Sequence, residues 1–149
     1  MESTLRMLVP LMLLLLSQIT QADPEAEVKY RQAVMKAVGG HMASMAAILK
    51  GKTHLSELSV HADGMAALAK VVPGVFPEGS GNVGHTEALP VIWTDPQAFK
   101  TAMDKYVEAA DGMQKAAASG EMSQVGPAIN ALGQSCKGCH DDFREEHDH

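Results

Sequence analysis

Aromatic residues are scarce in this sequence. They make up 4% of 149 residues: one Trp, two Tyr and three Phe. The core of a domain this size usually contains more large flat side chains. Ala-, Leu- and Met-rich helical cores also lack aromatics, but a bound planar group would fill the same volume. The length leaves room for one domain and a short extra segment.

Clusters of basic residues are also missing. The chain has 12 Lys and Arg against 18 Asp and Glu, a formal net charge of −6. Proteins that bind nucleic acid need grouped positive charge to contact phosphates. We therefore expect no nucleic-acid partner.

Long hydrophobic runs are limited to the N-terminus, where Met7 to Leu16 is almost unbroken. Spanning a bilayer takes roughly 20 apolar residues, so this run is too short. Arg6 before it and Thr20-Gln21-Ala22 after it are typical of a signal peptide, residues 1–22, cleaved after Ala22. The alternative is an uncleaved N-terminal anchor. We expect residues 23–149 to be exported to the periplasm, with no membrane insertion of the mature chain.

No segment shows a convincing strand pattern, and apolar residues instead recur at helical spacing. In the first predicted helix the inward residues are Val28, Met35, Val38, Met42, Met45 and Leu49. The predicted helices cover 24–49, 55–72, 94–118 and a last segment that begins between 121 and 127 and ends near 146. Pro127 is expected in the first turn of the last helix, because an interior Pro would break it.

The link over 73–94 is unusually long for a compact domain, which is typical of loops that wrap a functional site. The other links are short. Short links favour antiparallel neighbours, so the predicted fold is all-α, an up-down-up-down antiparallel four-helix bundle in one domain, 23–149.

The two cysteines lie in Cys136-Lys137-Gly138-Cys139-His140. This C-x-x-C-H pattern is the attachment motif for c-type haem. Residues three and four apart share a helix face. Both sulfurs can therefore form thioethers with one macrocycle, and His140 can place a nitrogen on the iron. The motif predicts one covalent haem c inside the bundle.

Other interpretations of the motif remain open. A disulfide at this spacing would close a very small loop. A thioredoxin-like site needs a βαβ setting, which is absent from the pattern. Zinc could bind Cys136, Cys139 and His140 with His147 or His149, although structural zinc sites usually take a second pair from a separate turn. A chance match in a core helix is the remaining alternative.

With this motif nine residues from the C-terminus, the sequence resembles the cytochrome c′ family, the class II c-type cytochromes. The matching segments are Lys29-Tyr30-Arg31-Gln32 with Met35, Phe76-Pro77-Glu78-Gly79, Pro90-Val91-Ile92-Trp93-Thr94-Asp95 with Phe99, and Gly133–Arg144. The resemblance implies a left-handed bundle around one haem, often a homodimer, and periplasmic electron transfer or binding of gases such as NO. It implies thioethers at Cys136 and Cys139 and a proximal iron ligand at His140.

The resemblance also places Met35 on the distal side of the iron. Low-spin relatives use a methionine there as a ligand, whereas gas-binding relatives have a bulky uncoordinated residue. Methionine is also a common gap-filler in cores. Arg31 matches a family arginine near the haem propionates, with a solvated surface role as the alternative. Arg144 matches a basic residue beside the proximal face, where a solvent role is the alternative.

Four other histidines are alternatives as sixth ligand, and we interpret all four as surface residues. They are His41, His54, His61 and His85. The tail His147-Asp148-His149 can collect metal ions weakly.

Three functions follow from these residues. The first is an electron carrier ligated by His140 and Met35, which raises the reduction potential; it would serve redox partner proteins and would not be an enzyme. The second is a five-coordinate cytochrome c′ that binds NO or CO. The third is a haem-free periplasmic metal-binding bundle.

Overall fold

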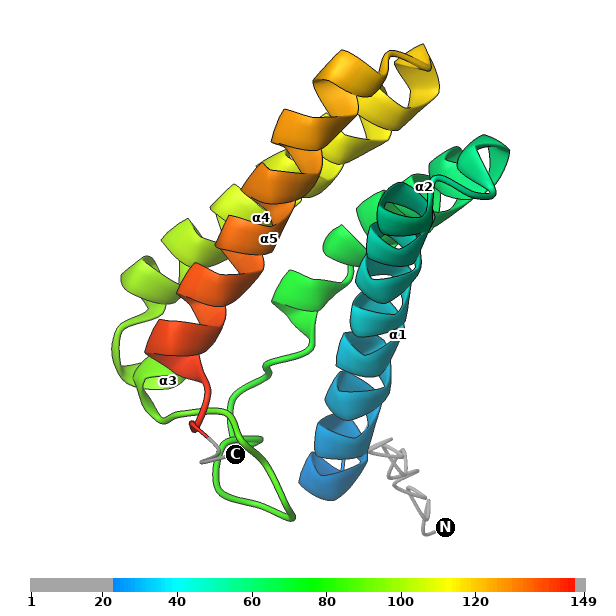
Figure 1. Ribbon diagram of the computed structural model, residues 1–149. Helices are drawn as coiled ribbons and strands as arrows, with labels where there is room; N and C mark the ends of the chain where they lie inside the picture. The colour runs from blue at the N-terminus through cyan, green and yellow to red at the C-terminus, as the bar shows by residue number, and fades with distance from the viewer. Residues whose placement is uncertain (1–22, 147–149) are drawn as a thin grey trace, which may run out of the picture.

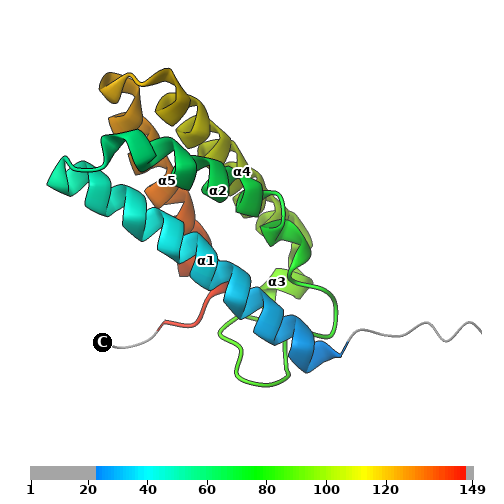
Figure 2. The ribbon, with the colours of Figure 1, turned by 90° about the vertical axis from the view of Figure 1, so that its right-hand side faces the viewer.

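The computed structural model describes residues 23–146, and within them the chain forms an all-α bundle (Figures 1 and 2). Its four long helices are α1 (Pro24–Gly51), α2 (Leu58–Ala69), α4 (Pro96–Ser119) and α5 (Met122–Phe143). Single turns are η1 (Leu55–Glu57), η2 (Val72–Gly74) and α3 (Val91–Thr94). The predicted four-helix bundle is confirmed. The predicted signal peptide lies outside the described residues.

The helix ends follow local sequence signals. Asp23 and Asp95 are N-caps whose side chains accept hydrogen bonds from the backbone N–H groups of Glu25 and Ala98, and each precedes a proline in the first turn. Such caps satisfy donors that have no partner within the helix. At the other end of α4, Gly120 adopts φ +71°, which glycine takes without steric cost. No helix in this described range is both long and apolar enough to cross a membrane.

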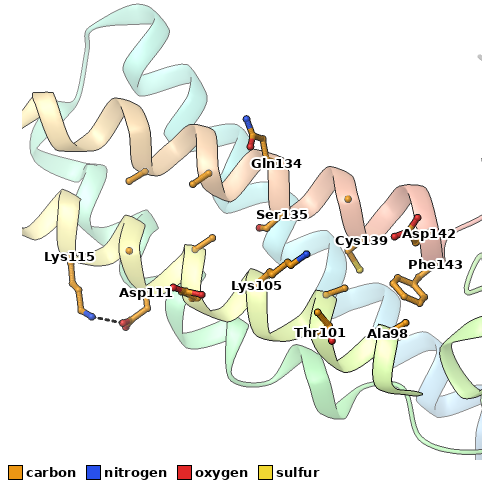
Figure 3. A pocket seen from close by; sticks show the side chains of 17 residues that line it. Ala98, Thr101, Lys105, Asp111, Lys115, Gln134, Ser135, Cys139, Asp142 and Phe143 are labelled. Carbon is orange, nitrogen blue, oxygen red and sulfur yellow. Dashed lines mark ion pairs between the residues drawn. The ribbon is translucent and has the colours of Figure 1, made fainter. Parts of the chain in front are cut away.

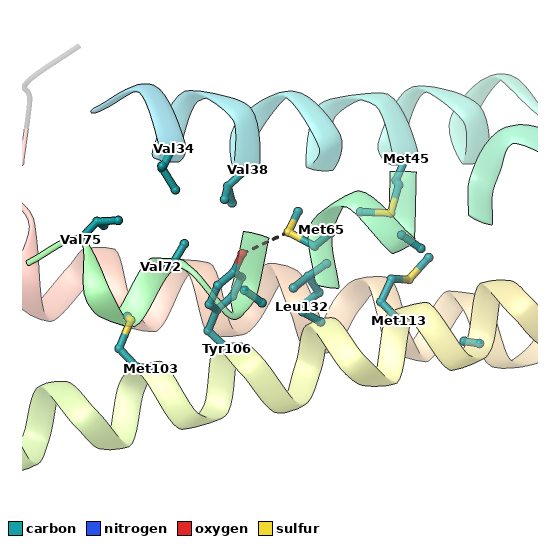
Figure 4. Close-up of a cluster of buried hydrophobic side chains, with 14 of the residues drawn as sticks. Val34, Val38, Met45, Met65, Val72, Val75, Met103, Tyr106, Met113 and Leu132 are labelled. Carbon is teal, nitrogen blue, oxygen red and sulfur yellow. Dashed lines mark hydrogen bonds between the residues drawn. The ribbon is translucent and has the colours of Figure 1, made fainter. Parts of the chain in front are cut away.

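The packed core lies where α2 contacts α1 and α4, and where α4 contacts α5. Met45, Met65, Met113 and Leu132 are fully buried there (Figure 4). The Tyr106 hydroxyl donates a hydrogen bond to the Met65 sulfur, 3.3 Å away. Met side chains fill this core because they adapt to irregular gaps.

The inward face of α1 differs from the prediction. Val34 and Ile48 are buried instead, while Met35, Met42 and Leu49 are only half-buried. Met35 and Met42 pack against the edge of the core and line a cavity. The helix therefore has two apolar surfaces, one against α2 and one facing the cavity.

The last helix also differs from the prediction. It begins at Met122, so Pro127 lies in the second turn. Proline removes one backbone N–H from the helix, but Pro127 and Ser123 are exposed, so water can satisfy the Ser123 carbonyl. The helix ends at Phe143 rather than near 146, because Arg144 becomes extended and forms an isolated bridge with Ala88.

Candidate haem site

A cavity of about 730 Å³ lies between α1 and α5, with α4 and the 75–88 loop completing its wall. Its volume is in the range of cofactor sites. Among the described residues, α1 and α5 make few backbone contacts, and Figure 1 shows α1 standing apart from α5. Most of the surface of the cavity is apolar.

All three residues of the attachment motif line this cavity. Cys136 and Cys139 are free and half-buried, and His140 lies at the rim. They occupy the last two turns of α5, so the i, i+3 and i+4 positions share one face as the sequence predicts. This arrangement presents two sulfurs and one imidazole to the same space.

The thiols are poor nucleophiles in this setting. Burial raises the pKa of Cys136. Burial also raises the pKa of Cys139, to about 11, with smaller contributions from the negative charges of Cys136 and Asp142. Reactive redox thiols instead have lowered pKa values, in electropositive surroundings. The site therefore argues against a thioredoxin-like dithiol.

The His140 imidazole is held toward its neutral form. Desolvation and the nearby Arg144 charge lower the pKa of His140, while Asp141 and Glu87 act in the opposite direction. A neutral imidazole keeps the nitrogen lone pair that a metal ligand needs. The electrostatics therefore suit an axial ligand.

The wall contributed by α1 is apolar over most of its length, with Arg31 and Gln32 at its N-terminal end. Met35, Val38 and Met42 line it, with Gly39 between them. Met35 thus shares one cavity with His140, on a different helix. This placement is compatible with both of the distal roles considered for Met35.

Arg31 is buried, with 4% of its surface exposed, so the solvated alternative is wrong. Its Nη1 donates to the Val75 carbonyl (3.4 Å) and Ser80 Oγ (2.8 Å). Its Nη2 donates to the Ser80 carbonyl (2.9 Å) and Thr86 Oγ1 (2.8 Å). Arg31 therefore ties α1 to the 75–86 loop. A contact with a haem propionate stays a prediction.

The buried guanidinium has little nearby negative charge. Desolvation lowers the pKa of Arg31, and Glu27 partly opposes that shift. The Phe76 ring lies 5.1 Å from the Arg31 guanidinium carbon, within cation–π range. The arginine therefore stays charged but is held mainly by neutral acceptors.

Trp93 secures the same loop from α3. Its indole N–H lies 3.2 Å from both the Phe76 and Pro77 carbonyls. A Cβ at Gly81 would lie 2.6 Å from the Trp93 ring, so only glycine fits there. The long loop that the sequence predicts is therefore an ordered wall of the cavity.

The end of α5 closes one edge of the cavity. Leu89 N–H donates to the Phe143 carbonyl (3.0 Å), and Glu145 N–H donates to the Glu87 carbonyl (2.8 Å). Arg144 Nε lies 3.6 Å from Glu87 Oε2. Arg144 thus joins the loop to the rim beside His140.

The other histidines divide into two pairs. His54 and His85 are exposed, as expected. His41 and His61 are only partly exposed, because both are half-buried between α1 and α2. Over residues 23–146, no group of three or more His, Cys, Asp or Glu side chains could hold a metal ion. The zinc alternative also needs His147 or His149, so it stays a prediction. The tail histidines lie outside this range.

A second hollow of about 950 Å³ lies along the outer side of α4 and α5 (Figure 3). Its walls carry exposed Lys105, Glu108 and Asp142 beside small residues, and an Asp111–Lys115 ion pair of 2.7 Å. Charged, exposed walls do not suit an apolar macrocycle. The cavity that contains Met35 is the better haem site.

Sequence reasoning missed part of the wall. The cavity wall includes five residues that the sequence does not identify as lining a site: Val72, Ile92, Phe99, Tyr106 and Phe143. Phe99 and Tyr106 recur at helical spacing within 94–118, which indicates an inward face but not that this face meets a cavity.

The family model for cytochrome c′ matches residues 26–144. The chain belongs to the cytochrome c′ family. It is 43% identical over 125 residues to cytochrome c′ of Pararhodospirillum photometricum, covering 83% of this chain and all of that protein. The predicted family is confirmed.

Solved structures show the same fold. Cytochrome c′ of Shewanella frigidimarina is 34% identical, with a TM-score of 0.79 over 85% of this chain and 99% of that one. Variants of the Alcaligenes xylosoxidans cytochrome c′, one bound to nitric oxide and one to carbon monoxide, are each 27% identical, with TM-scores of 0.77 over 84% of this chain and 98% of theirs.

Members of this family bind one covalent haem c, and the residues of this cytochrome c′ fit that group. Two adjacent thiols, a neutral-leaning imidazole and an apolar cavity are the donor set and surroundings that c-type haem requires. The predicted cofactor is confirmed. Ligation of the iron by Met35 stays a prediction.

Proposed function

We propose that this cytochrome c′ binds small neutral gases such as NO and CO in the cavity beneath Met35, with haem attached through Cys136 and Cys139 and ligated by His140. The bound group supplies an iron centre that binds diatomic gases and changes oxidation state. The observation that carries the proposal is the single cavity shared by the attachment motif and the apolar wall of α1.

The chemistry of that wall supports uncharged ligands. Met35, Val38 and Met42 offer no strong hydrogen-bond donor to a bound gas. Distal polarity and donors help decide between oxygen binding, activation and electron transfer. An apolar wall favours NO and CO, the two gases bound in the Alcaligenes xylosoxidans structures.

Electron transfer with His140 and Met35 as ligands is the second candidate. The Met35 side chain lines the same cavity as His140 and carries a thioether, a known axial ligand in cytochromes c. In this role the protein would exchange single electrons with redox partner proteins. Neither candidate transforms a substrate.

The absorption spectrum separates the two candidates. For gas binding, oxidised wild-type protein is high-spin and reduced protein binds CO readily. A low-spin spectrum with a weak red band from an iron–sulfur bond, and slow or absent CO binding, would instead establish Met35 as a ligand.

Matched substitutions sharpen the test. If Met35 is uncoordinated, Met35→Ala leaves the iron high-spin and mainly changes the rate of CO binding. If Met35 is a ligand, Met35→Ala abolishes the red band and lowers the reduction potential. Met42→Ala is the control, because Met42 lines the same wall two turns away; it should leave the ligand field unchanged. Haem-free protein would exclude both candidates and favour the metal-binding bundle.

We also propose that the protein is exported to the periplasm after cleavage following Ala22. Asp23 caps α1 directly after this site, so a chain that begins there retains the complete helix. A homodimer of two such chains is a separate proposal. Intact mass should correspond to residues 23–149 plus one haem. A mass that includes residues 1–22 would make the segment an anchor, and sedimentation at several concentrations would measure the dimer.

A further inference from the structure

Two imidazoles meet between α1 and α2, away from the haem cavity. His41 Nδ1 lies 3.3 Å from His61 Nδ1, and the ring planes cross at 63°. Both side chains are half-buried, and neither lines the haem cavity. The pair is therefore a separate cluster of nitrogen donors.

Gly64 leaves the space that the His41 ring occupies. A Cβ at this position would stand 2.3 Å from His41 Cε1 and 2.6 Å from Nε2. Any side chain would displace the ring, so the imidazole occupies space that only glycine leaves. Gly64 and His61 are one turn apart on α2. One turn of α2 therefore supplies the His61 imidazole and leaves room for the His41 imidazole beside it.

Without a metal, the two nitrogens are within hydrogen-bond distance, one imidazole donating and the other accepting. The same separation fits coordination of one metal ion in place of that hydrogen bond. Nitrogens bound to zinc at about 2.0–2.1 Å in tetrahedral geometry lie about 3.3–3.4 Å apart. Imidazole is a preferred ligand of zinc, copper and nickel. We propose that His41 and His61 form a two-imidazole binding site for a divalent transition-metal ion, with both Nδ1 atoms as ligands.

The surroundings determine the kind of site. Within the described chain, no third His, Cys, Asp or Glu completes the cluster, so water fills the remaining positions. Each imidazole carries its proton on Nε2 in the metal-bound form. Copper(II) stands highest in the order of divalent first-row affinities, which makes it the most sensitive probe. Its tetragonal geometry places neighbouring nitrogens about 2.8 Å apart, so the two half-buried rings would move slightly closer together when it binds.

The test uses haem-loaded protein in which His147 and His149 are replaced by Gln, so that the tail offers no imidazole. Calorimetric titration with Cu²⁺ near neutral pH should show one equivalent bound. His41→Gln or His61→Gln should weaken binding at least about tenfold, since even second-shell partners of metal ligands change affinity 10–100-fold. His85→Gln is the control and should bind like the parent, because His85 is exposed in the loop.

Two further measurements separate the site from alternatives. Gly64→Ala keeps both imidazoles but displaces one, so it should weaken Cu²⁺ binding while dichroism shows an unchanged helix content. Cu²⁺ should raise the unfolding temperature of the parent but not of His61→Gln, because the ion bridges two helices of the native state.

Three results would overturn the proposal. The first is no Cu²⁺ binding by the parent, and the second is equal affinity in the parent and His41→Gln. The third is loss of affinity in only one of the two histidine variants, which would describe a single imidazole rather than a shared site.

Discussion

The seam between α2 and α4 and the space between α1 and α5 use similar residues but are packed differently. Ala62, Met65, Ala110 and Met113 close the first so completely that none exposes any surface. Met35 and Met42 stand on the second and remain half-buried, around about 730 Å³ of cavity. Voids larger than a water molecule are few in protein interiors, so this space is a binding site rather than a packing defect.

The comparison shows how one helix serves two purposes. Met45 on α1 is fully buried against the core, while Met35, nearly three turns earlier, lines the cavity. Both are apolar and both lie on helical spacing. Only the neighbouring helix decides whether a methionine stabilises the bundle or contacts the cofactor.

The largest expected effect comes from removing both haem anchors. The Cys136→Ala, Cys139→Ala double variant should lose all covalent haem and at least about 4 kcal/mol of stability, the linkage expected from a ligand at a thousandfold its Kd. Intact mass and thermal unfolding would measure both. Ser135→Ala is the neighbouring control and should keep its haem; acid–acetone extraction of haem from wild-type protein would contradict the attachment.

A core substitution should affect stability but not the haem. Met45→Ala removes a fully buried side chain and should cost about 2–5 kcal/mol of unfolding free energy. The visible spectrum should stay unchanged, because Met45 does not line the cavity. Met122→Ala is the exposed control, with an effect within about 0.5 kcal/mol. A changed ligand field in Met45→Ala would break the distinction between the two regions.

Replacing Arg31, which ties α1 to the 75–86 loop, should have an intermediate effect on stability. Arg31→Met leaves the Ser80 and Thr86 hydroxyls without their donor and should cost about 1–3 kcal/mol. Hydrogen exchange should increase in the 75–86 loop more than in α4. Lys29→Met, an exposed neighbour on α1, should show neither change. If Arg31 also pairs with a propionate, the reduction potential will shift in Arg31→Met only.

The smallest effect is expected at the rim. Arg144 and Glu87 are both exposed and 3.6 Å apart, so a double-mutant cycle of Arg144→Gln and Glu87→Gln should give about 0.2–1 kcal/mol of coupling. The coupling should fall as salt is added, because exposed charges are screened. Coupling well above this range would mean that the rim, like the α2–α4 seam, is held rigidly.

The sequence by itself determined the helices and the cofactor. Capping at Asp95, the αL position of Gly120 and the periodicity of Phe99, Met103 and Tyr106 are local properties, since each depends on residues within a turn or two. The C-x-x-C-H motif is local too, because its chemistry needs only one helix face.

Only the tertiary structure decided what each apolar helix face contacts. Periodicity identifies an apolar stripe but not its neighbour, so it could not separate Met35 in the cavity from Met45 in the core. Arg31 is buried because loop carbonyls and hydroxyls 44–55 residues away supply its acceptors. α5 ends early because Arg144 pairs with Ala88, and His41 and His61 meet because α1 packs on α2 beside Gly64. Each depends on contacts between distant residues, which local patterns do not encode.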